Sequence, residues 1–252
     1  MTSRGLHKVE QLLDQAGPAG LVLGIDTAGP AVVLGLVGQE VVLAAAKQTD
    51  QSHAASLPLM VEGLFKQAGA EFADLNGIAV GIGPGSFTGV RVGLSYGKGL
   101  AFAARCSLVG VSSLESMAVC ALDCPRARAG TMVCAVINAG REQFYNALYR
   151  VNEGGLEQVS AAALADAARL TACLVGEVIL VGDDLGPLEG RLRELAEGRA
   201  TIAAFAVAER RAAALAAIGA ARIATGHTDS LSALEPLYVR AGQAWSSQTP
   251  AT

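Results

Sequence analysis

Short apolar runs alternate along this chain with stretches whose apolar residues recur at helical spacing, and together they predict the order of its elements. From Gly20, the apolar runs "GLVLGIDTAG" and "AVVLGLVGQEVVLAAAK" predict three strands joined by turns at residues 29–30 and 38–39. A helix is predicted next, capped by Ser52 and ended by Gly69. Its apolar face consists of Leu57, Val61, Leu64, Phe65 and Ala68.

The alternation of predicted strands and helices continues through a glycine-rich segment. A buried strand is predicted at 77–81, followed by a helix that ends near Ala104 and a strand at 107–111. Ser112 then begins another helix, and Glu115 three positions later predicts a capping box. The first half therefore has the order βββαβαβα, and "CPRARAG" has the proline, glycine and charge of a linker.

The second half repeats this order. It begins with a predicted hairpin, "TMVCAVINAG" and "REQFYNALYRV", and a third strand in "GGLEQVS". The remaining predicted elements are a helix at 161–171, a strand at 177–182, a helix at 188–197, a strand at 201–207 and an alanine-rich helix at 208–225.

A duplicated βββαβαβα order is the topology shared by actin and the sugar kinases, in which two similar lobes face each other across a cleft. We therefore expect an α/β chain with a duplicated actin-like, ribonuclease H-like two-lobed fold. The predicted boundaries are an N-terminal extension at 1–19, a first lobe at 20–124, a second lobe at 131–240 and a C-terminal tail at 241–252.

Composition narrows the function classes. Of the 252 residues, 52% are hydrophobic and 17% charged, which indicates a folded globular protein. The net charge of −4 disfavours tight nucleic-acid binding by this chain alone, so any contact with RNA would require a partner. No apolar run reaches the length of a membrane span, and no secretion signal is visible.

The cysteines indicate a protein of a reducing compartment. They lack paired metal-site spacing and are interpreted as reduced core residues of a cytoplasmic protein. They are Cys106, Cys120, Cys124, Cys134 and Cys173.

The segment "GIGPGSFTGVRVGLSYGKGL", residues 81–100, is the strongest candidate for chemistry. Its glycines before a helix suggest a phosphate cradle, yet neither G-x-G-x-x-G nor G-x-x-x-x-G-K-[ST] fits. Ser95 lies in a G-x-S-x-G match, with Asp183 and His227 following in hydrolase order. That motif requires a sharp strand-to-helix turn, whereas Ser95 is predicted in mid-helix, so the esterase interpretation is disfavoured.

A third interpretation is close packing. Gly89, Gly93 and Gly97 recur every four residues and form a smooth stripe on one helix face. Each interior glycine costs about 1 kcal/mol relative to alanine, so close contact with another helix should offset that cost. The second helix belongs either to this chain or to a partner, and Arg91 beside the stripe either lines the interface or is solvated.

Acidic residues after two strands are candidates for a phosphate site. Asp26 and Thr27 in "GIDTAG" resemble the phosphate hairpin of the duplicated kinases, and Asp183 in "LVGDD" occupies a similar place in the second half. The alternatives are that Asp26 caps its turn and that Asp183 lies in a solvated turn. His53 lacks a second ligand at i+4, where Leu57 stands, so no metal site is expected there.

At "GPGSFTGVR", residues 83–91, the chain resembles the TsaB family, subunits of the bacterial tRNA threonylcarbamoyladenosine synthesis machinery. Similar stretches extend over most of the chain: "GIDTAG", "HAASLPLMVEGLF", "GVSSLESMA", "LVGDD" and "LEPLYVR".

The resemblance implies an actin-like fold and a non-catalytic scaffold. Its implied partners are the threonylcarbamoyl-transferring paralogue TsaD, the ATPase TsaE and a second copy in a homodimer, with tRNA contacted only through the complex. ATP and metal would be used by those partners, and no cofactor is assigned to this chain. The implied interface helices span 53–68 and 87–101, with His53, Leu57, Val61, Leu64, Gly89, Arg91, Gly93 and Gly97 as interface residues. Asp26, Thr27 and Asp183 would be a vestigial nucleotide site, and a free-standing small-molecule kinase of the same fold is the alternative.

Overall fold

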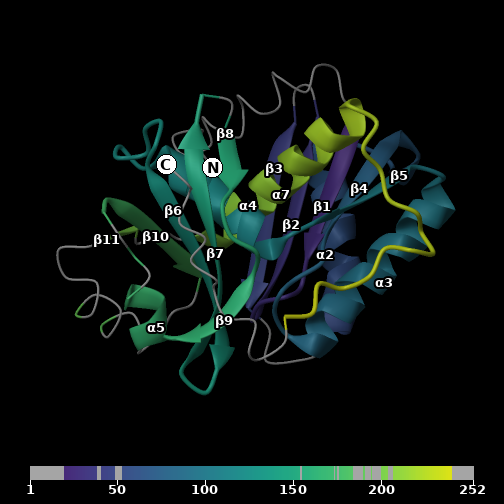
Figure 1. Cartoon of the computed structure of the whole chain (residues 1–252). Coiled ribbons are helices and arrows are strands. Elements are labelled where there is room, and N and C mark those ends of the chain that lie inside the picture. The colour runs from purple at the N-terminus through teal and green to yellow at the C-terminus, as the bar shows by residue number, and fades with distance from the viewer. Residues whose placement is uncertain are drawn as a thin grey trace.

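The computed structural model contains two mixed β-sheets with helices between them and on both outer sides (Figure 1). It describes residues 20–38, 41–48, 53–153, 155–172, 174, 176–183, 190, 194, 200–203 and 207–239. The predicted extension at 1–19, the predicted tail at 241–252, Ser52 and nearly all of the predicted helix at 188–197 lie outside these residues.

The first sheet has the strand order β3-β2-β1-β4-β5. Its members are β1 (Leu21–Asp26), β2 (Ala31–Val37), β3 (Val42–Gln48), β4 (Leu75–Gly81) and β5 (Ser107–Val111). β1, β2 and β3 pair antiparallel, whereas β1, β4 and β5 pair parallel. The three-strand meander and the buried strands predicted from the sequence are confirmed.

The second sheet repeats this arrangement with the order β11-β10-β6-β7-β8. Its members are β6 (Met132–Gly140), β7 (Gln143–Asn152), β8 (Gly155–Gln158), β9 (Ala163–Asp166), which pairs with β7, β10 (Val178–Asp183) and β11 (Ala200–Ala203). Since β8-β7-β6-β10-β11 matches β3-β2-β1-β4-β5, the duplication predicted from the sequence is confirmed.

The helices complete the pattern. They are α2 (His53–Ala68), α3 (Phe87–Ala104), α4 (Ser113–Cys120), α5 (Ala167–Ala172) and α7 (Val207–Ala224), with short 3-10 turns η1 (Phe72–Asp74) and η2 (Ala121–Asp123). The predicted helix at 161–171 is half wrong, because its first part is strand β9. Pairing with β7 holds Ala163 and Ala165 in an extended conformation, against the helix propensity of alanine.

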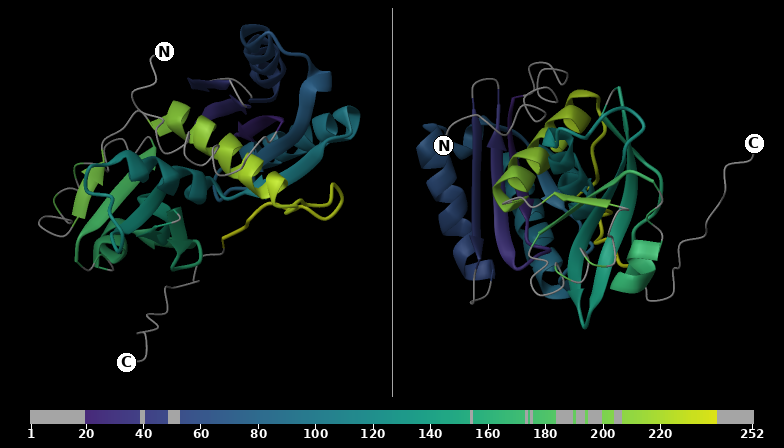
Figure 2. Two further views of the ribbon diagram at one scale, coloured as in Figure 1. Left: turned by 90° about the horizontal axis from the view of Figure 1, so that it is seen from above. Right: turned by 90° about the vertical axis from the view of Figure 1, so that its left-hand side faces the viewer.

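The layer between the sheets joins the two halves of the sequence. α7 packs on the first sheet and α4 on the second, and the two helices contact each other (Figure 2). α2 and α3 cover the other face of the first sheet, and α5 lies beside β7 and β9. A helix from the second half therefore completes the core of the first sheet.

Glycines in the first sheet let α7 approach closely. Gly24 and Gly35 are cross-strand partners, and both face α7. A Cβ on Gly35 would lie 2.1 Å from the backbone oxygen of Ala212, and one on Gly24 would lie 2.9 Å from the backbone nitrogen of Ala216. Gly219 of α7 faces Ala79 in the same way. The alanine-rich composition of α7 is thus matched by glycines on the sheet face that it covers.

A half-buried ion pair links α4 to α7. It takes the place of the predicted capping box. Glu115 accepts two 2.7 Å hydrogen bonds from the Nη2 atom of Arg222, which also donates through Nη1 to the backbone oxygen of Gly110. Ser112 is the N-cap residue of α4 but makes no side-chain cap bond. Because a cation from α7 is available to Glu115, the tertiary pair replaces the local one.

Candidate functional site

The glycine-rich loop between β4 and α3 is packed against the turn between β1 and β2. A Cβ on Gly85 would lie 2.3 Å from the backbone oxygen of Ala28, and the Ser86 amide donates to that same oxygen at 2.7 Å. Gly83 has a φ of +92°, which glycine adopts without strain. The loop is therefore held by the chain itself and is not an open phosphate cradle.

The glycine stripe of α3 is buried against the first sheet. A Cβ on Gly89 would lie 2.1 Å from the backbone oxygen of Thr27, and one on Gly93 would lie 2.3 Å from the Thr27 hydroxyl. Gly97 lies against Val80 and Ile78. The expectation of a second helix against this stripe is therefore wrong, because the stripe faces the turn after β1 and strand β4 of its own chain.

The apolar face predicted for α2 is also internal. Leu57, Val61 and Leu64 are buried in the core between α2, α3 and the first sheet. These residues position the two helices, and a partner would meet the opposite sides of α2 and α3. Of the predicted interface residues whose side chains the structure describes, only Arg91 is exposed. The side chain of His53 lies outside the described part of the chain.

The predicted phosphate residues are enclosed. Asp26 is 0% exposed; its Oδ1 accepts from the Ala28 amide at 2.7 Å, and its Oδ2 has no hydrogen-bond partner among the described residues. Gly81 closes over it, since a Cβ there would lie 2.5 Å from the Asp26 Cγ. The Thr27 hydroxyl, also buried, donates to the Gly89 carbonyl at 2.6 Å. Asp183 ends β10 in the other sheet, and its side chain lies outside the description.

We expect Asp26 to stabilise the turn between β1 and β2. Asp26→Ala removes the acceptor for the Ala28 amide and should lower the free energy of unfolding by about 1–3 kcal/mol, because a buried donor is left unsatisfied. Asp26→Asn keeps an acceptor oxygen and should stay within about 1 kcal/mol of the wild type. Urea unfolding followed by circular dichroism measures both. Equal losses in the two variants would contradict this assignment.

The hydrolase residues do not meet the geometry of that motif. Ser95 is exposed in the middle of α3, away from the turn at residues 82–86. His227 follows α7, and its Nδ1 lies 3.0 Å from the Thr225 hydroxyl. Within the described residues there is also no group of three or more His, Cys, Asp or Glu side chains placed to hold a metal ion.

An open groove runs between α2 and α3 on the side away from the sheet. It has a volume of about 630 Å³, and Arg91 is the single charged residue among the described residues that line it. The other lining residues are Ala54, Leu57, Phe87, Thr88, Val92, Ser95 and Tyr96. We call this groove, with the exposed residues of α2 and α3 beside it, the α2–α3 face.

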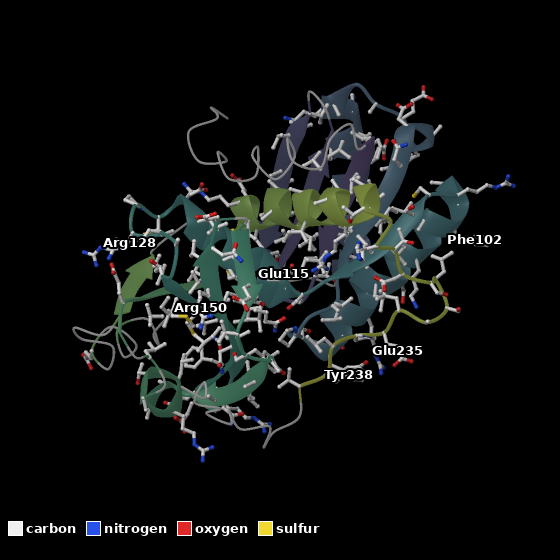
Figure 3. The ribbon with its side chains drawn as sticks, turned by 45° about the horizontal axis from the view of Figure 1, so that its top comes forward. Phe102, Glu115, Arg128, Arg150, Glu235 and Tyr238 are labelled. Carbon is white, nitrogen blue, oxygen red and sulfur yellow. The ribbon has the colours of Figure 1, made fainter. Side chains whose placement is uncertain are left out.

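Large apolar side chains gather around this face. Phe102 on α3 is 76% exposed and Leu59 on α2 is 71% exposed. Of the seven exposed large hydrophobic residues in the described part of the chain, all but Val159 lie on α2, α3, η1 or the segment at 225–239. Figure 3 shows Phe102 and Tyr238 on the same side of the molecule, away from Arg128 and Arg150.

The segment at 225–239 lies beside this face, and the sequence did not predict that position. After α7 it runs back along the first sheet, where the Leu237 amide donates to the Ile82 carbonyl at 2.8 Å. Tyr238 thereby reaches Arg91, whose Nε donates to its hydroxyl at 2.9 Å. The motif "LEPLYVR" was the available signal, but nothing in its composition indicated that it meets the first turns of α3.

No helix among the residues described here is long and apolar enough to cross a bilayer.

Comparison with known proteins identifies the fold and the family. Residues 44–239 match the family model described as "TsaD: tRNA N6-adenosine threonylcarbamoyltransferase". The chain is 32% identical over 234 residues to the tRNA threonylcarbamoyladenosine biosynthesis protein TsaB of Escherichia coli (strain K12), covering 89% of this chain and 96% of that protein.

Solved structures agree. YeaZ from Pseudomonas aeruginosa superposes with a TM-score of 0.70 at 25% identity, over 87% of this chain and 99% of that one. Component A of the Acidaminococcus fermentans (R)-2-hydroxyglutaryl-CoA dehydratase has a TM-score of 0.50 at 13% identity, covering 81% of this chain and 99% of that one, and shares the fold alone. The actin-like two-lobed fold predicted from the sequence is confirmed, and the chain belongs to the TsaB branch of the TsaB/TsaD family.

Proposed function

We propose that this protein is a docking subunit in tRNA threonylcarbamoyladenosine biosynthesis, and that it binds a TsaD-type threonylcarbamoyltransferase through its α2–α3 face. The pathway is that of its TsaB relative, and the family model it matches is described as the transferase. TsaE, a second copy of the chain and tRNA are further partners in this proposal, with tRNA reached only through the complex.

The observation that supports docking is the distribution of exposed apolar side chains. Leu59, Phe87 and Phe102 project from two helices whose other sides are fully occupied by the core. Large apolar side chains gathered on one exposed surface are characteristic of protein interaction sites. Aromatic and arginine side chains at the centre of such a surface contribute most of the binding energy.

A non-catalytic role is supported by the enclosure of the predicted phosphate residues. Asp26 is fully buried, and the loop at residues 82–86 is bonded to the turn that a phosphate would have to approach. In the proposal, the TsaD-type protein and TsaE supply the metal and the ATP chemistry.

Two measurements test this assignment. Cells depleted of the protein should lose threonylcarbamoyladenosine from their tRNA, as quantified by mass spectrometry of digested nucleosides, and the wild-type chain should restore it. An unchanged nucleoside level after depletion would remove the protein from the pathway.

The free-standing kinase alternative makes a different prediction. A kinase must bind Mg-ATP by itself, so calorimetric titration of the purified chain would show saturable heat. We expect none, because the carboxylate that would face the nucleotide is enclosed. Saturable binding that Asp26→Asn abolishes would favour the kinase.

A further inference from the structure

The C-terminal segment at 225–239 is fixed on the first sheet at several points. The Asp229 carboxylate accepts from the Gly110 amide at 2.8 Å, and the Asp229 amide donates to the Leu108 carbonyl at 2.8 Å. Leu234 is buried against Gly110 in the core. Together with the Leu237 bond to Ile82, these contacts fix the segment beside β4 and β5, so that Tyr238 has a defined position next to α3.

Tyr238 completes a cluster of three side chains with Phe87 and Arg91. The Arg91 guanidinium carbon lies 3.8 Å from the centre of the Phe87 ring, and its Nε donates to the Tyr238 hydroxyl at 2.9 Å. The two rings are 5.6 Å apart between centres. A guanidinium stacked on a ring and bonded at Nε has lost most of its rotational freedom.

This rigid cluster is nevertheless exposed. Phe87 is 57% exposed and Tyr238 is 49% exposed, and Arg91 is exposed as well. Nε is the one nitrogen of Arg91 with a partner in the described part of the chain, so Nη1 and Nη2 remain available. Their N–H groups form the planar fork that binds a carboxylate through two hydrogen bonds.

The charge of the groove limits which protein can pair with Arg91. Among the described residues that line it, Arg91 is the only charged one, and no acidic residue of that set pairs with it. In a symmetric dimer each copy presents the same patch, so a second copy brings a second Arg91 and, among the described lining residues, no carboxylate. A non-identical partner that presents a carboxylate to the groove therefore fits Arg91 better than the same groove of a second copy does.

We propose that the docking face extends onto the C-terminal segment, where Tyr238 positions Arg91 to bind an acidic side chain on an otherwise apolar helix of a non-identical partner. This inference rests on the proposed function, because the TsaD-type protein is that partner. Tyr238 is a positioning residue in this arrangement and Arg91 is the anchor. The cluster selects the heterologous complex over self-association.

The test is calorimetric titration of the full-length chain and its variants into the TsaD-type protein of the same organism. Arg91→Glu should weaken binding at least about 100-fold, since it reverses the charge at the anchor. Arg91→Lys keeps the charge but loses the fork and should weaken binding about 10-fold. Tyr238→Phe removes only the hydroxyl and should weaken binding about fivefold, with Arg91 in place but less restrained.

The matched control is Arg169→Glu on α5, an exposed arginine on the other sheet, which should leave affinity within about twofold. Self-association of Arg91→Glu, measured by sedimentation, should be equal to or stronger than that of the wild type. Wild-type binding that Arg91→Lys and Tyr238→Phe leave unchanged would overturn this inference while preserving the docking proposal. Equal weakening of both complexes by Arg91→Glu would overturn the preference for a non-identical partner, whereas no wild-type binding would overturn the docking proposal itself.

Discussion

Gly89→Ala should destabilise the protein by about 3 kcal/mol, although alanine is the better helix former. The added methyl group would lie 2.1 Å from the backbone oxygen of Thr27. That oxygen belongs to the turn between β1 and β2, which cannot rotate away as a flexible side chain does. The whole of α3 would have to shift from the sheet. Urea unfolding of the purified variant measures the loss.

Gly99→Ala is the matched control in the same helix. Nothing lies within 4 Å of a Cβ at Gly99, so the substitution should raise the free energy of unfolding by about 0.5–1 kcal/mol through helix propensity alone. The two variants make the same chemical change and are expected to have opposite signs. If both raised stability, the contact between α3 and the turn after β1 would be wrong.

Phe87→Asp should weaken the complex with the TsaD-type protein at least about 100-fold while leaving the chain folded. Phe87 is 57% exposed and begins α3, where an acidic residue interacts favourably with the helix dipole. The substitution removes the ring on which Arg91 stacks and places a carboxylate in an apolar groove. Calorimetric titration measures the affinity, and circular dichroism checks the fold.

Val159→Asp serves as the control for that variant. Val159 is 42% exposed after β8, on the second sheet and remote from α3, so its replacement should leave affinity unchanged. Comparable losses in both variants would indicate a general effect of added charge. Retained affinity in Phe87→Asp would place the docking surface elsewhere.

Much of the fold could be predicted because local and tertiary preferences agree in it. The apolar runs of the first sheet, the apolar face of α2 and the alanine-rich α7 each form the predicted element and are buried in the core. The prediction failed at residues 163–166, where pairing with β7 overrides helix propensity. It also failed at Glu115, where a cation from a distant helix replaces the local cap.

The candidate site was less predictable, and the glycines explain why. A stripe at Gly89, Gly93 and Gly97 indicates close approach, but the sequence does not say whether a strand or a helix approaches. The same limit applies to Leu57, whose apolar character fits a core and an interface equally well. Tyr238 lies 147 positions from Arg91, so only the folded chain shows that they meet.

The most direct test of the docking proposal is light scattering on a sizing column, with the purified chain alone and then mixed with the TsaD-type protein from the same organism. We expect the mixture to elute as a stoichiometric heterocomplex that replaces any homodimer of the chain. Separate elution of the two proteins at micromolar concentration would contradict it.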